Sequence, residues 1–161
     1  MRAALPGLAL LLCAGCGAAD DPPAVPSAPV TAPSTALPAG QPALPTVPAR
    51  VGGTALQVEV AATPEQKAAG LRGREVPPGT GMVFPYDVAA TVRFTMAGVD
   101  RPLVAVFARD GLAVSVEQLA PCAGTVQECP TYGPDEPVDL VLEAAPGSLP
   151  GARPGDPVAV G

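Results

Sequence analysis

The chain contains no histidine. Histidine is the side chain whose ordinary pKa lies near neutrality, and it is a common metal ligand. Its absence excludes Ser-His-Asp and Cys-His catalysis and histidine-ligated zinc. The serines do not lie in a Gly-x-Ser-x-Gly elbow either, so serine hydrolase chemistry is not expected. The sequence therefore indicates no catalytic residue, metal or cofactor, and it leans toward a non-enzymatic role without deciding the question.

Basic and aromatic residues are also scarce. The chain has 9 Lys and Arg against 15 Asp and Glu, a net charge of −6, and only 3% of its residues are aromatic. An acidic protein repels phosphate backbones, so nucleic acid is not an expected partner. Proline and glycine, by contrast, are abundant at 23 and 18 residues, which indicates that part of the chain does not pack into a core. The length of 161 residues allows one domain.

The longest N-terminal apolar run is short. Ala3 to Leu12 follows Arg2 and falls well below the roughly 20 residues that a membrane-spanning helix needs. A positive residue before such a run is typical of a secretory signal. The run ends in Leu12-Cys13-Ala14-Gly15-Cys16, which resembles the bacterial lipobox. Residues 1–15 are therefore predicted to be a signal peptide, and Cys16 the lipidated first residue of an exported lipoprotein that is anchored to a membrane and faces the periplasm or cell exterior.

One feature departs from the lipobox. Cys13 stands where the lipobox usually has leucine. An ordinary signal peptide is one alternative. Cys13-x-x-Cys16 also matches a thioredoxin-like redox pair or half of a zinc site. Those two readings need a folded context that a signal sequence does not provide.

A proline-rich segment follows the signal. Gly17 to Arg50 consists mainly of Ala, Pro, Ser, Thr, Val and Gly, with nine prolines. Proline at this density prevents helices and sheet ladders and favours an extended polyproline conformation. Such a stalk could reach on the order of 100 Å at about 3.1 Å per residue. Residues 16–50 are thus predicted to be a disordered stalk, and residues 51–161 the folded domain.

The start of the domain predicts a strand and then a short helix. Leu56–Ala62 alternates as a half-buried strand does. Thr63 can cap a helix, Pro64 suits its first turn, and Gln66 completes a capping box. Gly70 is a suitable terminator.

The rest of the domain predicts further strands. They are expected at Met82–Phe84, Val92–Met96, Leu103–Ala108, Leu112–Leu119, Val138–Ala144 and Pro157–Val160. Arg109-Asp110-Gly111 predicts a hairpin turn, since glycine tolerates a positive φ. Leu103–Ala108 is apolar on both faces and should be a central strand. The expected fold is mainly β, or β-rich α+β: a compact, barrel-like domain of short strands with one short N-terminal helix.

Short motifs in a fixed order run through most of this domain. They are VEVA (Val58–Ala61), TPEQ-xxx-GL (Thr63–Leu71) closing on Arg74, GMVF (Gly81–Phe84), FTM (Phe94–Met96), RPLVAVF (Arg101–Phe107), PC (Pro121-Cys122), CPTY (Cys129–Tyr132), VLE (Val141–Glu143) and GD (Gly155-Asp156). In this order the set resembles the bacterial and archaeal family called domain of unknown function 192. The resemblance implies a small, often exported β-rich domain whose activity is not established.

The chain departs from that family at three places. Thr95 stands where the family often has an aromatic residue, Gly98-Val99 where it has Asn-Thr, and Val104 where it commonly has Asp. A ligand held by those groups in relatives is therefore not expected to bind here.

Two cysteines remain in the domain. Cys122 and Cys129 enclose six residues. In an oxidising compartment such a pair most often closes a loop as a disulfide, which contributes about 2–3 kcal/mol. A redox-active pair is the alternative, although the spacing is not that of Cys-x-x-Cys.

Five residues are candidates for ligand binding. Arg74 could bind an anion or carboxylate, or its positive charge could interact favourably with the dipole at the C-terminal end of the short helix. Glu143 follows an apolar stretch, and a buried carboxylate needs a partner, which Arg74 or Arg93 could provide as a structural salt bridge. An outward-facing side chain is the alternative. Phe94, Met96 and Tyr132 are expected in the core, with a ligand-facing position as the alternative.

The predicted function is a membrane-tethered, non-enzymatic binding or accessory domain of the cell envelope. Its partner would be a small molecule, a glycan or an envelope protein. One alternative is an envelope enzyme that uses Arg74 and Glu143. A purely structural lipoprotein is the other.

Overall fold

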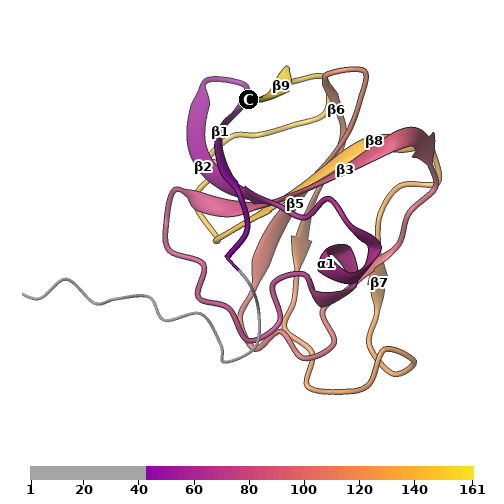
Figure 1. Ribbon diagram of the computed structural model, residues 1–161. Helices are drawn as coiled ribbons and strands as arrows, with labels where there is room; N and C mark the ends of the chain where they lie inside the picture. The colour runs from indigo at the N-terminus through magenta and orange to yellow at the C-terminus, as the bar shows by residue number, and fades with distance from the viewer. Residues whose placement is uncertain (1–42) are drawn as a thin grey trace, which may run out of the picture. The chain divides into compact units, whose positions relative to one another are not determined.

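The structure, a computed structural model, describes residues 43–161. These residues form one α-helix, α1 (Pro64–Ala69), and nine strands (Figure 1). The strands are β1 (Thr46–Val51), β2 (Thr54–Val60), β3 (Thr80–Ala90), β4 (Phe94–Thr95), β5 (Leu103–Arg109), β6 (Leu112–Leu119), β7 (Thr131–Tyr132), β8 (Val138–Ala144) and β9 (Val158–Val160). The predicted signal peptide and Cys16 lie outside the described residues. Within residues 43–161, no helix is long and apolar enough to cross a membrane.

Seven strands form one sheet that curls into a half-barrel. Their order is β6-β5-β8-β3-β2-β1-β9, and β2 and β3 are the parallel pair. The curl brings the two edge strands together, since the amide of Ala113 donates to the carbonyl of Asp156 at 2.9 Å and that of Val158 to Gly111 at 2.8 Å. β4 and β7 pair in a separate two-stranded ribbon. The predicted mainly β, barrel-like fold with one short helix is confirmed.

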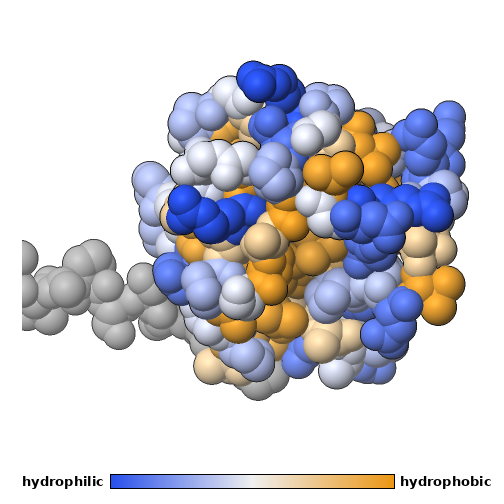
Figure 2. All heavy atoms as spheres, turned by 90° about the horizontal axis from the view of Figure 1, so that it is seen from above, coloured by the Kyte–Doolittle hydropathy of each residue, from blue (hydrophilic) through white to orange (hydrophobic). Residues whose placement is uncertain are grey.

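The sheet buries both of its faces. Along β5 the residues alternate between two hydrophobic clusters: those at odd positions from Leu103 to Phe107 join one cluster, and those at even positions from Val104 to Ala108 join the other. The inner face packs against β1, β2 and β9, whereas the outer face is covered by α1 and the loops around it (Figure 1). The prediction that Leu103–Ala108 is a central strand is confirmed. At the β9 end of the domain, apolar atoms lie at the centre of the face, framed by hydrophilic residues (Figure 2).

The local predictions for the helix and the hairpin are also confirmed. Thr63 caps α1 and forms the capping box with Gln66, and Gly70 ends the helix with φ +53°. The hairpin between β5 and β6 turns through Asp110 and Gly111, both with positive φ. This is the backbone that a two-residue turn between twisted strands requires.

The folded region begins earlier than the predicted boundary at Val51. β1 starts at Thr46 and lies between β2 and β9, with Ala49 and Val51 buried on the inner face. Pro48 is tolerated because it lies just beyond the last residue pair between β1 and β9, Ala49 and Val160. Its carbonyl accepts from the amide of Gly161, and its missing N–H would face the same side, at the end of the ladder. The last residues of the predicted stalk are therefore part of the sheet.

Candidate functional site

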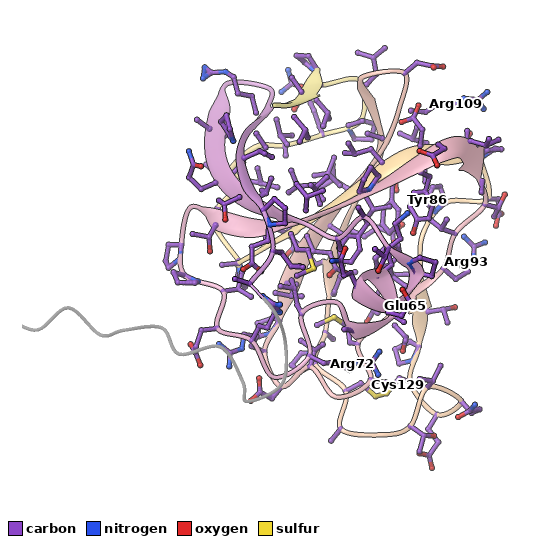
Figure 3. All side chains as sticks on the ribbon, in the orientation of Figure 1. Glu65, Arg72, Tyr86, Arg93, Arg109 and Cys129 are labelled. Atoms are coloured by element: carbon purple, nitrogen blue, oxygen red, sulfur yellow. A yellow bond between two sulfur atoms is a disulfide. The ribbon has the colours of Figure 1, made fainter. Side chains whose placement is uncertain are left out.

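A pocket of about 380 Å³ opens on the outer face of the sheet. Its walls come from α1 and the turn after it, from β3, and from the segment around β4. In Figure 3, Tyr86 and Arg93 lie on one side of α1, and Arg72 and Cys129 both lie below it in this view. The pocket thus gathers parts of the chain that are far apart in sequence.

Glu143 forms the sheet side of the pocket. It lies on β8 opposite Met82 of β3 and Ala105 of β5, both fully buried. Its neighbours Leu142 and Ala144 point to the inner face, so strand alternation sends the carboxyl to the outer face. Glu143 is only 5% exposed, and it lines the pocket.

The environment of this carboxyl is poor in hydrogen-bond donors. Within the described part of the chain, the Glu143 carboxyl accepts no hydrogen bond. Burial removes it from water and raises its pKa from 4.5 to about 7. The Tyr86 hydroxyl has its own pKa raised, mainly by burial and partly by the charge of Glu143. Near neutral pH, Glu143 can therefore exist both as a carboxylic acid and as a carboxylate.

The predicted ion pair between Glu143 and Arg74 or Arg93 is not what the structure shows. Arg74, although buried, donates to Glu59 on β2. Arg93 donates to Asp135 and to the backbone carbonyls of residues 133–134. The loop after α1 carries Arg74 toward β2, and β3 separates that strand from β8. Each arginine is thus drawn to a different acid.

Three cationic side chains line the pocket: Lys67, Arg72 and Arg93. The Lys67 ammonium lies 4.2 Å from the centre of the Tyr86 ring and donates to the Pro85 carbonyl. The Nε of Arg72 donates to the carbonyl of Ala69 at 3.2 Å. Its terminal Nη groups make no hydrogen bond or ion pair within residues 43–161. Arg72 therefore keeps its two terminal donor groups available.

Apolar side chains complete the walls. Phe84 and Phe94 meet edge to face with their ring centres 5.0 Å apart, and Phe94 meets Phe107 in the same way at 5.9 Å. Met96 and Val126 also line the pocket. The cavity thus joins an apolar wall to a carboxyl on one side and guanidinium and ammonium groups on others.

The structure brings together three of the five predicted ligand-binding residues, namely Phe94, Met96 and Glu143. Arg74 and Tyr132 are not among the residues that line the pocket. Tyr132 lies on β7 opposite Phe94, and its hydroxyl accepts from the amide of Ala120 at 3.2 Å, so it supports the wall from behind.

The predicted disulfide between Cys122 and Cys129 is present. The loop that it closes brings Val126 to the pocket, with this side chain 50% exposed. The amide of Gly98 also donates to the carbonyl of Cys122 at 3.1 Å, which ties the loop to the segment after β4. The disulfide therefore fixes one wall of the pocket.

Sequence reasoning did not identify Lys67 and Tyr86 as pocket residues. Tyr86 could have been found by extending the alternation of β3, since it shares a face with Phe84. Two of the departures from the related family, Thr95 and Val99, line the pocket as well. The third, Val104, lies in the inner cluster.

Comparisons with known proteins agree with this architecture. A crystal structure of a protein described as a putative transcription regulator from Sinorhizobium meliloti 1021 has 27% sequence identity and a TM-score of 0.66, with 75% of this chain and 98% of that chain covered. A protein of unknown function from Novosphingobium aromaticivorans DSM 12444 has 26% identity and a TM-score of 0.64, with 72% and 86% covered. The comparison with curated proteins finds no match.

The family comparison spans the domain. Residues 47–160 match the model of DUF192, which is described as uncharacterized ACR, COG1430. This range runs from β1 to β9, and it includes α1 and every strand residue except Thr46, the first residue of β1. The chain therefore belongs to the DUF192 family.

Proposed function

We propose that this protein is an exported lipoprotein whose DUF192 domain binds a small molecule in the pocket at Glu143. The observation that supports binding is a carboxyl only 5% exposed, facing a cavity of about 380 Å³ without a hydrogen bond from the described residues. Among the described residues, no side-chain oxygen or nitrogen is both fully buried and without a partner, so the Glu143 oxygens keep some exposure, and this carboxyl lines the cavity. A ligand that donates a charge-assisted hydrogen bond to Glu143 would take the place of water there.

Binding is favoured over catalysis by the groups around the pocket. General acid–base chemistry needs groups placed on the reacting atoms in complementary roles. Here Glu143 is the acid that lines the cavity, and Arg74, the partner in the enzyme alternative, is paired with Glu59 outside it. A cavity with convergent polar groups also fits a binding role better than a purely structural one.

The Sinorhizobium protein is described as a putative transcription regulator, a role that the charge of the present chain does not support. The present chain carries a net charge of −6. DNA binding depends on neutralising phosphates with Lys and Arg. An acidic domain with a pocket fits a small partner better.

Membrane attachment is proposed from the sequence, because Cys16 lies outside the described residues. The lipobox-like Leu12–Cys16 segment and the proline-rich region before β1 support a tethered domain. Intact mass of protein extracted from membranes tests the anchor. We expect a chain that begins at Cys16 and carries acyl mass. A mature chain that begins elsewhere, or that lacks acyl mass, would contradict it.

A ligand screen tests the binding function. The full chain, purified in detergent, would be screened by thermal shift against a library of small envelope and nutrient metabolites. The matched variant Thr95→Trp adds a large side chain to the wall of the pocket and should abolish the shifts caused by pocket ligands. Arg109→Ala is the control, because Arg109 is an exposed residue on the hairpin far from α1 (Figure 3). The absence of hits, or hits that survive Thr95→Trp, would contradict the proposal.

A further inference from the structure

We propose that the ligand of this pocket is a small organic anion, a carboxylate or a phosphate, whose opposite end carries a hydrogen-bond donor. The inference rests on the proposed binding function and concerns the chemistry of the ligand. It follows from three separate features of the cavity: its cations, its buried carboxyl and the apolar wall between them.

The pocket is lined mainly by positive charges, although the chain as a whole is negative. The full chain has a net charge of −6, whereas the pocket is lined by Lys67, Arg72 and Arg93 against the single carboxyl of Glu143. A recess lined by cations with low-dielectric walls raises the local concentration of anions. The balance of charge therefore favours an anionic ligand.

Arg72 is the cation best placed to bind that anion. Lys67 already donates to the Pro85 carbonyl, and Arg93 is held by Asp135. Arg72 uses its Nε on the carbonyl of Ala69 and keeps its terminal Nη groups available. A guanidinium fork matches the two oxygens of a carboxylate or phosphate.

Gly98 helps to position this arginine. It has φ +74°, and a Cβ at this position would lie 3.3 Å from the Cδ of Arg72. The stem of Arg72 therefore packs against the bare backbone of Gly98, which limits how the guanidinium can turn. This contact links the cation to the segment that carries Thr95 and Met96 in the pocket wall.

Glu143 determines the other end of the ligand. Its carboxyl lies on the sheet side, buried among apolar neighbours, and the described residues supply no donor to it. An amine or hydroxyl would satisfy it, and an amine would also neutralise its charge. The apolar wall from Phe94, Met96 and Val126 suits a short hydrocarbon segment between the two ends.

Probes that separate the two ends test this inference. β-Alanine, γ-aminobutyrate and δ-aminovalerate carry both groups at increasing separation. γ-Hydroxybutyrate replaces the amine by a hydroxyl, and phosphoethanolamine replaces the carboxylate by a phosphate. Butylamine and butyrate each carry one end. Affinities would be measured by calorimetry on the full chain in detergent. The probe that binds most tightly identifies the preferred anion and the preferred hydrogen-bond donor.

The expected result is a two-ended dependence. The best two-ended probe should bind at least about tenfold more tightly than butylamine or butyrate, which corresponds to about 1.4 kcal/mol. Arg72→Ala should weaken that probe at least about tenfold and leave butylamine unchanged, as expected when a charge-assisted hydrogen bond is lost. Glu143→Gln should remove the advantage of the amine but leave butyrate unchanged. Arg109→Ala and Glu136→Gln, two changes at exposed residues, should leave the affinity for every probe unchanged.

Failure of this inference can be distinguished from failure of the proposed function. If neutral or purely cationic molecules bind best, with no effect of Arg72→Ala but with loss on Thr95→Trp, the pocket binds small molecules and the anion inference is wrong. If every probe and library member fails to bind, or if binding survives Thr95→Trp, both proposals are wrong. The thermal midpoint of each variant in the absence of probes shows whether it is folded.

Discussion

Replacing Glu143 by glutamine should make the stability of this protein much less dependent on pH. Burial raises the pKa of Glu143 from 4.5 to about 7 in the folded chain. The folded state therefore holds this proton to higher pH than the unfolded state does. The stability that goes with the protonated form is complete below pH 4.5, and it is lost as the pH rises toward and through 7.

The size of the effect follows from the same pKa values. At about 1.4 kcal/mol per pKa unit, a rise from 4.5 to about 7 corresponds to about 3 kcal/mol in all. Most of this, about 2–3 kcal/mol, is lost between about pH 5 and about pH 8. In a domain of this size that amounts to a fall of roughly 10 °C in Tm. Glu143→Gln keeps the shape of the side chain and removes the titration, so it should be more stable than the parent at about pH 8.

Urea denaturation of the ligand-free full chain at several pH values measures this difference. The groups near Glu143 in the pocket are Tyr86 from β3, Lys67 from α1, and Arg72 and Arg93 from the loops. The tyrosine stays neutral over this pH range, because burial and the charge of Glu143 raise its pKa above its ordinary value.

The control makes the same chemical change at an exposed site. Glu136→Gln should retain the parental pH dependence, because Glu136 is exposed to solvent. Parallel pH profiles for the parent and Glu143→Gln would refute the reasoning, since they would mean that Glu143 titrates alike in the folded and unfolded chains.

Three further changes test the walls of the site, each measured by urea denaturation. Gly81→Ala would place a Cβ 2.2 Å from the backbone carbonyl oxygen of Glu143 and should lower the free energy of unfolding by about 3 kcal/mol. Gly79→Ala has open space around its Cβ but a φ of +78°, and it should lower the free energy of unfolding by about 1–2 kcal/mol. Equal losses for the two variants would count against the close approach of β3 and β8. Replacing Cys122 and Cys129 by alanine should cost about 2–3 kcal/mol and weaken pocket binding, and an unchanged midpoint would contradict a structural role for the disulfide. Arg74→Ala should cost about 3 kcal/mol, because it leaves a partly buried carboxylate without its partner; a loss below about 1 kcal/mol would show that the pair is not structural.

Local signals in the sequence gave correct predictions because their physics is local. The capping box at Thr63 and the turn at Asp110 involve residues three or fewer positions apart. β1 was missed for the opposite reason. Its composition matches the proline-rich segment before it, and one of the strands that pairs with it, β9, lies more than 100 residues later in the chain. A strand defined by such distant pairing leaves little trace in its own residues.

The candidate site was only partly predictable for the same reason. The apolar stretch before Glu143 predicted its burial, but the path of the loop from Gly70 to Gly79 decides where Arg74 lies. β3 was expected to end at Phe84, before Pro85. β3 continues because its pairing with β2 ends at Val83, whereas its pairing with β8 goes on through Pro85. The missing N–H of Pro85 faces the β2 side, where β3 no longer has a partner strand. Tyr86 enters the pocket through this continuation.

The two hydrophobic clusters lie on opposite faces of the sheet, and only the outer one borders the pocket. The inner cluster lies among strands that the curled sheet itself brings together, and the pocket lies wholly on the other side. Changes at Thr95, Val99 or Val126 therefore alter the cavity without touching the packing that closes the half-barrel. If the proposed binding function holds, the same separation would let substitutions in the pocket change its specificity while the scaffold stays intact.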